Sequence, residues 1–272
     1  MLVRTMDAAG RCAKVKFAVS RGRISGEWGT MEVEPGTLYV IGTPIGNLAD
    51  VTERARTCLG LVDRIACEDT RHSGVLLQHL GVRKPLVSLH EHNEAGRSAE
   101  LVGVLRAGGT VAYISDAGMP GVSDPGQRLV NACRREGLRV EVLPGPSAVL
   151  TALVGSGFPA DAFMFAGFLP VKSGQRGRAL EAALGREETT VFFESPHRIE
   201  GTLTMLAEVA PGRLICVARE LTKKFEEFRR GTAEEVAAHF RKHPARGEIC
   251  LVVSGTDLPK WAAWGAGEEG GA

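Results

Sequence analysis

Residues 115–126 read Ser-Asp-Ala-Gly-Met-Pro-Gly-Val-Ser-Asp-Pro-Gly, and this stretch decides how the chain is interpreted. It follows an apolar run, residues 111–114, that has the composition of a buried strand, and a helix is expected directly after it. Three glycines, two prolines and two aspartates in twelve residues exclude regular structure and indicate a rigid loop with exposed backbone groups. In open α/β sheets, ligands bind at the carboxyl ends of the strands. The stretch is therefore predicted to be a ligand-binding loop.

A second loop of this kind, residues 42–50, follows the short apolar run 38–41 and reads Gly-Thr-Pro-Ile-Gly-Asn-Leu-Ala-Asp. A helix is predicted to begin after it, with Asp50 as the N-cap and Glu53 placed for a capping-box-like return. A strand, a glycine loop and a helix N-terminus leave N–H groups pointing at a bound group. An ordinary strand-to-helix connection has the same pattern, so this loop alone does not decide between the two. It is neither a P-loop nor a GxGxxG fingerprint, because the Lys-Ser/Thr and the glycine spacing are absent.

The composition restricts the class of protein. A chain of 272 residues with 44% hydrophobic and 24% charged residues is typical of a globular protein with two modest domains. No apolar stretch approaches the roughly 20 residues of a membrane span, and we expect a cytoplasmic protein with no membrane partner. The six cysteines form no CxxC pair, so they are interpreted as small buried hydrophobic residues, and no metal site is predicted. The net charge of +1 neither demands nor excludes a nucleic acid partner.

Strand and helix patterns alternate along the first half of the chain. Strands are predicted at 38–42, 62–67, 86–89, 110–115 and 139–143, and helices at 51–60, 71–80, 94–107 and 126–136. This alternation predicts a largely parallel five-stranded sheet that is covered on both faces.

A second α/β unit with a mixed sheet is predicted after residues 144–147. Its strands are expected near 162–166, 189–194, 213–219 and 248–253, and its helices near 175–184, 197–209 and 232–242, with a short helix beginning near Ala148. Ser195 and Pro196 are predicted to start one helix as N-cap and first residue, and Thr232 with Glu235 is predicted to form a capping box.

The predicted domain organisation has four parts. Residues 1–34 form a basic extension that is expected to be disordered, and 35–146 form the N-terminal α/β domain. Residues 147–255 form the C-terminal α/β domain, and 256–272 a flexible tail.

Three backbone-rich loops are expected at one edge of the first sheet, because residues 144–148, Pro-Gly-Pro-Ser-Ala, follow the fifth strand. None of the three offers a lysine for a triphosphate. Backbone groups and carboxylates without a phosphate clamp suggest a nucleoside or an amino-acid-like molecule that carries positive charge. The available carboxylates are Asp50, Asp69, Asp116 and Asp124, of which Asp50 and Asp124 are also interpreted as a helix cap and a turn former.

Charged clusters end two further strands of the first unit. Residues 67–72, Cys-Glu-Asp-Thr-Arg-His, are interpreted as a functional or ion-pair cluster. Residues 90–94, His-Glu-His-Asn-Glu, favour substrate contacts over a metal site, because alternating residues in a turn do not converge on one ion. The second unit has a cationic loop, residues 172–178, and further basic residues that are consistent with a track for an RNA backbone, although such a loop is usually only a solvated surface.

These motifs together resemble the tetrapyrrole methylase family, and within it the ribosomal RNA small subunit methyltransferase I branch. The resemblance covers residues 36–255 and rests on eight motifs in family order: residues 38–50, 68–72, 90–94, 115–126, 143–146, 167–170, 193–198 and 218–223. It implies S-adenosylmethionine bound between two α/β domains, usually in a homodimer. The implied reaction is methylation of a cytidine ribose 2′-OH in the decoding region of small-subunit (16S) ribosomal RNA, with the naked RNA and the 30S subunit as alternative substrates.

The resemblance and the loop pattern together predict the site residues. The predicted cofactor contacts all lie in the three loops and are Gly42, Pro44, Gly46, Asn47, Asp116, Ala117, Gly118, Pro120, Val122, Pro144, Gly145, Pro146 and Ser147. Glu194, Glu68 and Asp69 stay as alternative general bases. The predicted RNA contacts are basic or imidazole side chains, namely Arg71, His92, Lys172, Arg176, Arg178, His197, Arg198 and Lys223.

Two other functions are retained as alternatives. One is a tetrapyrrole carbon methyltransferase on the same scaffold. The cationic second unit and the loop at 42–47 argue against it. The other is a ribosome-assembly protein that keeps a nucleoside pocket without catalysing a reaction.

Overall fold

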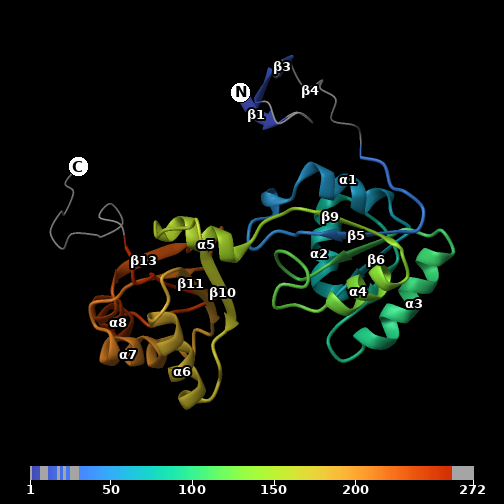
Figure 1. The fold of residues 1–272 in the computed structure, drawn as a ribbon. Helices are drawn as coiled ribbons and strands as arrows, with labels where there is room; N and C mark the ends of the chain where they lie inside the picture. Colours follow the sequence, from blue (N-terminus) through green and yellow to red (C-terminus); the bar gives the residue numbers. More distant parts are fainter. Residues whose placement is uncertain (1, 7–11, 17–18, 21–22, 25–30, 259–272) are drawn as a thin grey trace.

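The computed structural model describes residues 2–6, 12–16, 19–20, 23–24 and 31–258. Two five-stranded sheets with flanking helices form two lobes, joined by the segment that leads into α5 (Figure 1). The α/β class predicted from the sequence, with one parallel and one mixed sheet, is confirmed.

The first sheet has the order β7-β6-β8-β5-β9, and every described pairing in it is parallel. Its strands are β5 (Thr37–Ile41), β6 (Arg64–Cys67), β7 (Leu86–Ser88), β8 (Val111–Ile114) and β9 (Arg139–Leu143). The central strand is β8. The chain begins at β5, adds β6 and β7 towards one edge, returns through β8 between β6 and β5, and ends with β9 at the other edge. The carboxyl ends of β8, β5 and β9 are therefore neighbours.

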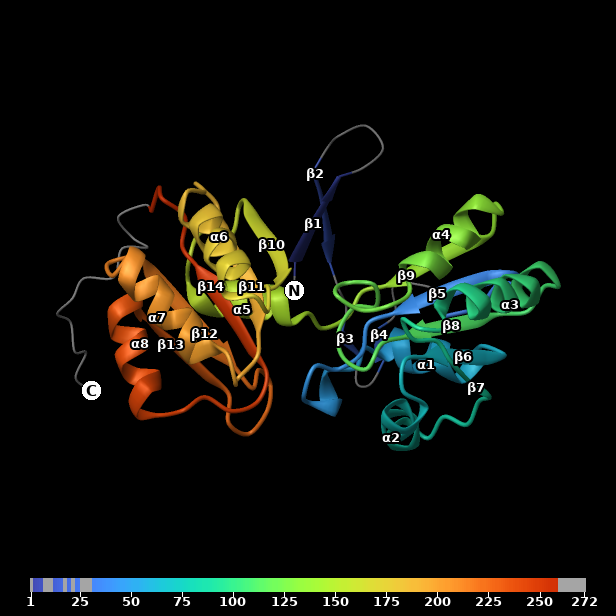
Figure 2. The ribbon, with the colours of Figure 1, turned by 90° about the horizontal axis from the view of Figure 1, so that it is seen from below.

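Helices lie on both faces of this sheet (Figure 2), and alternating side chains of each strand form two cores in the first domain. Tyr39 and Ile41 face α1 (Glu53–Leu61) and α2 (Thr70–Leu80), whereas Leu38 and Val40 face α3 (Glu94–Arg106) and α4 (Gln127–Arg135). Because successive side chains of a strand point to opposite faces, an unbroken apolar strand needs helices on both sides. The resulting sheet is rigid and holds the loops at its edge in fixed positions.

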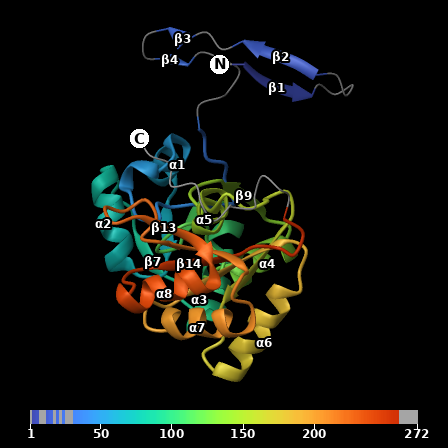
Figure 3. The same cartoon turned by 90° about the vertical axis from the view of Figure 1, so that its left-hand side faces the viewer.

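The second sheet has the order β10-β11-β14-β12-β13 and is mixed. Its strands are β10 (Phe163–Phe168), β11 (Thr189–Glu194), β12 (Leu214–Arg219), β13 (Glu227–Thr232) and β14 (Ile249–Val253), and only β10 and β11 pair in parallel. One face is covered by α6 (Ser173–Leu184), α7 (Ile199–Val209) and α8 (Ala233–Lys242) (Figure 3). The other face packs on α5 (Ala148–Ser156) and on Ile45 of the first domain. The two domains thus share one apolar cluster.

Local predictions at the helix ends had mixed outcomes. The predicted capping box of Thr232 and Glu235 is confirmed at the start of α8. Asp50 as N-cap was wrong: it ends the 3-10 helix η1 (Leu48–Asp50), and the Thr52 side chain caps α1 instead. Ser195 and Pro196 as the start of a helix were also wrong, because α7 begins at Ile199 after a turn.

The sequence analysis missed β13. This strand pairs antiparallel with β12 at the edge of the sheet, with Arg219 opposite Glu227. Its sequence, Glu-Phe-Arg-Arg-Gly-Thr, is dominated by charges, because an edge strand with one solvated face needs few apolar residues.

The N-terminal extension contains two short antiparallel pairs. β1 (Leu2–Met6) pairs with β2 (Cys12–Lys16), and β3 (Val19–Ser20) pairs with β4 (Arg23–Ile24). The disorder predicted for 1–34 falls in large part on residues outside the described ranges, as does the flexible tail from 259 onward. The division into domains at 146/147 stays a proposal. No helix in the described ranges combines the length and apolar composition of a membrane span.

Candidate functional site

The three predicted loops meet at the carboxyl edge of the first sheet. Thr43 and Gly118 exchange two backbone hydrogen bonds, of 2.9 Å from the Thr43 N–H and 3.1 Å from the Gly118 N–H. The Gly42 N–H donates to the Leu143 carbonyl at 3.2 Å. The prediction that the loops at 42–50 and 115–126 lie side by side is therefore confirmed.

Glycine is required where the loops after β5 and β9 touch. A Cβ on Gly42 would lie 2.7 Å from the Gly145 Cα and 2.6 Å from the Met119 sulfur, and a Cβ on Gly145 would lie 2.8 Å from the Gly42 Cα. Real Cβ atoms do not approach backbone atoms this closely. The two backbones pack directly against each other, which brings all three loops together.

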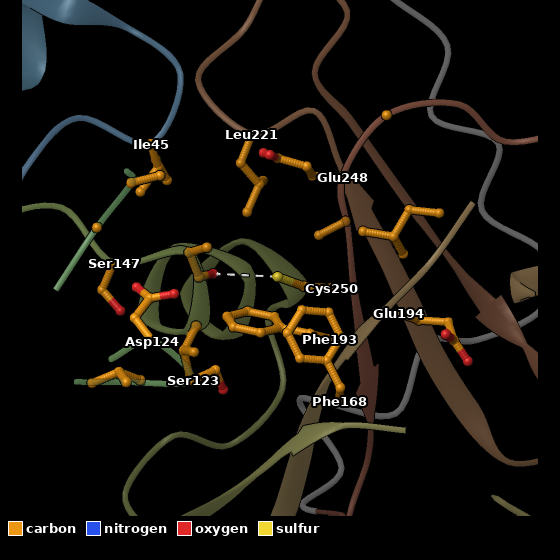
Figure 4. Close-up of a pocket in the computed structure, with 18 of the residues that line it drawn as sticks. Ile45, Ser123, Asp124, Ser147, Phe168, Phe193, Glu194, Leu221, Glu248 and Cys250 are labelled. Carbon is orange, nitrogen blue, oxygen red and sulfur yellow. Dashed lines mark hydrogen bonds between the residues drawn. The ribbon is translucent and has the colours of Figure 1, made fainter. Parts of the chain in front are cut away.

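A large cavity opens between these loops and the second domain (Figure 4). It has a volume of about 350 Å³, within the range of small-molecule sites. From the first domain it is lined by Ile45 and the loop from Ala117 to Asp124, and then by the start of α5 at Ser147. The cofactor cleft predicted between the two domains has a matching cavity at this place.

The charged side chains that line this cavity are carboxylates, of which Glu194 and Glu248 form ion pairs with Arg198 and Lys223 outside the lining. The ionisable acids and bases among its described lining residues are Asp124, Glu194 and Glu248, all carboxylates, apart from the Cys250 thiol. Burial is the main cause of a raised Asp124 pKa, the Asp116 charge adds to the rise, and a hydrogen bond from Ser115 opposes it. A cavity with acidic groups and no lysine or arginine disfavours a phosphate and suits a cation.

The second domain gives the cavity an aromatic wall. Phe168 and Phe193 meet edge to face with ring centroids 5.2 Å apart, and Phe168 stays 59% exposed. Figure 4 shows both rings on the side of the cavity opposite Ile45. An exposed ring over an apolar hollow is suited to the flat face of a nucleobase.

A second, polar hollow of about 400 Å³ lies beside the first, at the ends of β6, β7 and β8. Its lining includes Glu68, Asp69, Arg71, His90 and Asp116. Asp116 lines this hollow and the next residue, Ala117, lines the large cavity, so the two hollows adjoin at the same loop.

The pKa values of two carboxylates in the polar hollow are shifted in opposite directions. The pKa of Glu68 is raised, first by burial and then by the charges of Asp116, Asp124 and Asp69. The pKa of Asp69 is held well below its usual range by hydrogen bonds from the Arg71 side chain and backbone. Because the folded-state pKa of Glu68 is raised, its ionisation costs stability as the pH rises through that pKa.

Glu194 is buried and fully engaged. Its carboxylate accepts hydrogen bonds from the Ser195 N–H at 2.7 Å and the Thr202 hydroxyl at 2.8 Å, and it pairs with Arg198 at 2.6 Å. Arg198 in turn donates to the Leu169 carbonyl at 3.1 Å. Figure 4 shows the carboxylate directed away from Asp124 and Phe193. This group joins the loops after β10 and β11.

A close approach also links the loop 42–47 to the second domain. A Cβ on Gly46 would lie 2.5 Å from the Lys223 Cγ and 2.8 Å from the Leu221 carbonyl oxygen. In the loop after β12, which contains Leu221 and Lys223, Glu220 and Thr222 have positive φ values of 50° and 64°. Non-glycine residues in this region store strain that the surrounding packing must hold.

Comparison with known proteins identifies the fold and its family. The profile of the tetrapyrrole (corrin/porphyrin) methylases matches residues 37–237. The chain belongs to the tetrapyrrole methylase family.

Within this family, three relatives are curated as ribosomal RNA small subunit methyltransferase I. The protein from Mesorhizobium japonicum is 50% identical over 223 residues, covering 81% of this chain and 76% of the relative. Those from Synechocystis sp. and Escherichia coli O157:H7 are 47% and 45% identical over 221 and 232 residues, covering 81% and 82% of this chain and 79% and 81% of the relatives. This tetrapyrrole methylase is accordingly a methyltransferase.

Solved structures support the same fold. The uroporphyrin-III-C-methyltransferase from Thermus thermophilus superposes with a TM-score of 0.57 at 25% identity, covering 80% of this chain and 94% of the other. A diphthine synthase superposes with a TM-score of 0.64 at 13% identity, covering 83% and 92%, which shows the fold alone.

The predicted cofactor residues of this tetrapyrrole methylase divide into two groups. Ala117, Gly118, Val122 and Ser147 line the large cavity. The others are not among its lining residues, although Asp116 lines the adjoining polar hollow: Gly42, Pro44, Gly46, Asn47, Asp116, Pro120, Pro144, Gly145 and Pro146. The sequence analysis missed the lining residues of the second domain, among them Phe168, Ala218, Leu221 and Cys250. Phe168 and Leu221 lie within the motifs 167–170 and 218–223, and this position was the signal that could have identified them.

The predicted RNA contacts also divide. Arg71, Arg198 and Lys223 pair with Asp69, Glu194, and both Glu220 and Glu248, respectively. His92, Lys172, Arg178 and His197 are exposed, and Arg176 is half-buried and donates to the Val171 carbonyl. In the described part of the chain, no three His, Cys, Asp or Glu side chains converge as metal ligands.

The glycine contact generates a test. We expect Gly42→Ala and Gly145→Ala each to lower the affinity for the bound small molecule at least tenfold, because an added methyl group forces two loops apart. Gly60→Ala is the matched control: Gly60 lies in α1 with no atom near its would-be Cβ, and the change should stabilise the fold by about 0.5–1 kcal/mol. Isothermal titration and thermal unfolding measure both effects. Wild-type affinity in Gly145→Ala would show that the contact does not shape the site.

Proposed function

We propose that this protein transfers a methyl group from S-adenosylmethionine to the ribose 2′-OH of a cytidine in the decoding region of small-subunit ribosomal RNA. The observation that carries the proposal is the cavity between the domains, which is lined by backbone-rich loops and has only carboxylates as charged lining residues, in a chain 45–50% identical to methyltransferases of small-subunit ribosomal RNA. The proposed site of action is the cytoplasm, on the RNA or on the 30S subunit.

The residues of the large cavity fit S-adenosylmethionine, which is a nucleoside with an amino-acid end and a sulfonium cation. The loop 117–124 and Ser147 offer backbone groups and hydroxyls, and Asp124 offers a negative charge. The Phe168 ring offers a face for the adenine. The cofactor supplies an electrophilic methyl group when it is bound. All other requirements of the reaction fall on the protein.

The chain must align the 2′-oxygen and remove its proton. Alignment by fixed groups supplies much of the rate of such a displacement, and a positioned base adds roughly 10²–10⁴-fold. Of the three candidate bases, Asp69 is held by Arg71, and Glu194 is occupied by Ser195, Thr202 and Arg198. Glu68 lines the polar hollow next to the cofactor loop and has a raised pKa, which makes it a stronger base. We assign the proton transfer to Glu68.

Glu68→Gln tests this assignment. We expect kcat to fall by roughly 10²–10⁴-fold with little change in cofactor affinity, because the amide cannot accept the proton. In the wild-type enzyme, activity should be lost as the pH falls through the raised Glu68 pKa, above the value of about 4.3 of an ordinary glutamic acid. Methyl transfer from labelled cofactor to 30S subunits measures both. Asp69→Asn is the comparison variant, and an equal loss of kcat in it would remove the assignment to Glu68.

The exposed cations of the second domain support contact with the RNA backbone. Lys172 is the N-cap residue of α6, and Arg178 lies in its second turn. Neither forms an ion pair with another described residue. His197 is exposed in the turn before α7, next to the cavity-lining Pro196. Exposed cations contribute to phosphate binding in a way that depends on salt.

Charge reversal at α6 tests the RNA contact. Lys172→Glu with Arg178→Glu should weaken RNA binding and reduce the slope of log affinity against log salt by about two, because each of the two cations would neutralise one phosphate. Cofactor affinity should stay at the wild-type value. The double change Lys242→Glu with Arg241→Glu, at the far end of α8, is the control for net charge. An unchanged salt slope in the α6 variant would show that this surface does not touch RNA.

A homodimer is the proposed assembly, and one apolar surface supports it. Leu150 and Val154 on α5 are 50% and 73% exposed, and Phe163 and Met164 on the edge strand β10 are each 38% exposed. Figures 1 and 2 show α5 and β10 side by side. Exposed apolar groups concentrated on a helix and a neighbouring sheet edge are typical of an interface.

Val154→Glu tests the dimer. It should convert the protein to a monomer in sedimentation velocity, because a charge would be buried without a partner. Val75→Glu changes a 61% exposed valine on α2 and should leave the assembly unchanged. A wild-type dimer in Val154→Glu, or a monomeric wild-type protein, would exclude this surface.

The alternatives are separated by the acceptor. A tetrapyrrole carbon methyltransferase would transfer label to a porphyrinoid, and a non-catalytic assembly protein would bind cofactor without transferring label to any RNA. Label on a cytidine 2′-oxygen of 30S subunits or naked 16S RNA would support the proposal and identify the preferred substrate form.

A further inference from the structure

The helix that follows the cofactor loop has no cap of its own. α4 begins after Gly126, which has a φ of 118° and no side chain to accept a hydrogen bond, and its first turn contains no acidic residue. The first N–H groups of a helix need acceptors, particularly where the end is buried. Gly126 cannot be exchanged for a capping residue, because any Cβ there would overlap the Tyr113 ring.

A carboxylate from another helix supplies the missing cap. Glu94 is the first residue of α3, 32 positions earlier in the chain, and its side chain reaches the N-terminus of α4. Its Oε1 atom accepts hydrogen bonds from the Gly126 N–H at 2.8 Å and from the Arg128 N–H at 3.0 Å. Glu94 is only 7% exposed. A buried carboxylate at a helix N-terminus is stabilised both by these hydrogen bonds and by the helix dipole.

This cap fixes one end of the cofactor loop. The loop is held at its start by the two hydrogen bonds between Thr43 and Gly118, and at its end by Glu94 and by the Tyr113 hydroxyl, which donates to the Pro125 carbonyl at 2.6 Å. Between these anchors the chain from Met119 to Asp124 lines the large cavity. Ser123 in this part has a φ of 63°, a conformation that only firm anchors maintain.

The position of Glu94 is set in turn by the residues before it. The Asn93 side chain accepts a hydrogen bond from the His90 N–H at 2.9 Å and donates one to the Ser88 carbonyl at 3.2 Å. Ser88 and His90 line the polar hollow that contains the proposed base Glu68. One short segment therefore lines the polar hollow and, through Glu94, holds the end of the loop that lines the large cavity.

We propose that Glu94 is a positioning residue for the cofactor: by capping α4 from the side, it holds the loop 117–124 in its binding conformation. The proposal rests on the function proposed above for the cavity. It assigns Glu94 no contact with the substrate, and it requires an oxygen acceptor at this distance from the α4 backbone.

Three variants and a control test the proposal. Glu94→Ala removes the acceptor, Glu94→Asp keeps the charge but withdraws it by one methylene, and Glu94→Gln keeps an oxygen at the same distance. Glu91→Ala is the control, because Glu91 is an exposed carboxylate in the same turn. The measurements are S-adenosylmethionine affinity by titration calorimetry, the KM for this cofactor against kcat, and hydrogen exchange of the peptide covering 117–128 in the free protein.

We expect Glu94→Ala and Glu94→Asp to weaken cofactor binding about tenfold or more, with kcat at saturating cofactor within about threefold of wild type. Exchange of the 117–128 amides should become faster in both. Glu94→Gln should stay within about threefold in affinity, and Glu91→Ala should match wild type. A merely structural role would instead lower the active fraction, and hence kcat, without raising the cofactor KM.

Two outcomes would overturn the proposal: wild-type affinity and exchange in Glu94→Asp, or a loss in Glu94→Gln equal to that in Glu94→Ala. Should Glu94→Ala fail to fold, the aspartate and glutamine variants carry the test. Absence of cofactor binding in the wild-type chain would overturn the proposed function, while the exchange rates of 117–128 would still decide whether Glu94 holds the loop.

Discussion

The site depends on direct packing of one backbone against another. Because β9 and β8 flank β5, the loops that leave these strands are forced into contact, and side chains between them would hold them apart. Gly42 and Gly145 remove that obstacle, and the paired hydrogen bonds of Thr43 and Gly118 then join the third loop. The main-chain groups on the open side of this assembly face the second domain. The strand order of the first sheet and two glycines therefore determine where a ligand can bind.

The second domain completes the site by covering these loops. Leu221 and the residue after it contact Gly46, and Ile45 enters the core beneath α5, so the two domains are joined on both sides of the cavity. The strained residues Ser123, Glu220 and Thr222 all lie in the loops that meet there. Strain of this kind is maintained by packing, and it is concentrated where the ligand would be enclosed.

Local sequence signals predicted the first domain and its loops well, because glycine, proline and aspartate clusters after apolar runs are short-range features. They failed where a residue acts at a distance. Glu94 caps a helix 32 residues later, and no local pattern distinguishes it from Glu91. The edge strand β13 was not predicted, because its charged residues do not form an apolar pattern. Thr52, and not the predicted Asp50, caps α1, because a 3-10 helix comes before α1. The aromatic wall lies in the second domain, where its residues become neighbours of the loops only through the domain contact.

The carboxylates of the motifs illustrate how burial separates structural from chemical roles. Glu94 and Glu194 are both nearly inaccessible, and both have their oxygens satisfied by backbone or side-chain donors, so each stabilises a loop by remaining fixed. Glu68 lies in the polar hollow with like charges around it, and the described residues offer its carboxylate no hydrogen bond. A proton acceptor must be able to change its charge during the reaction, which a buried, fully bonded carboxylate resists. On the proposal that Glu68 accepts the proton, glutamates in three motifs have two different tasks, and the hydrogen-bond partners of each carboxylate distinguish them.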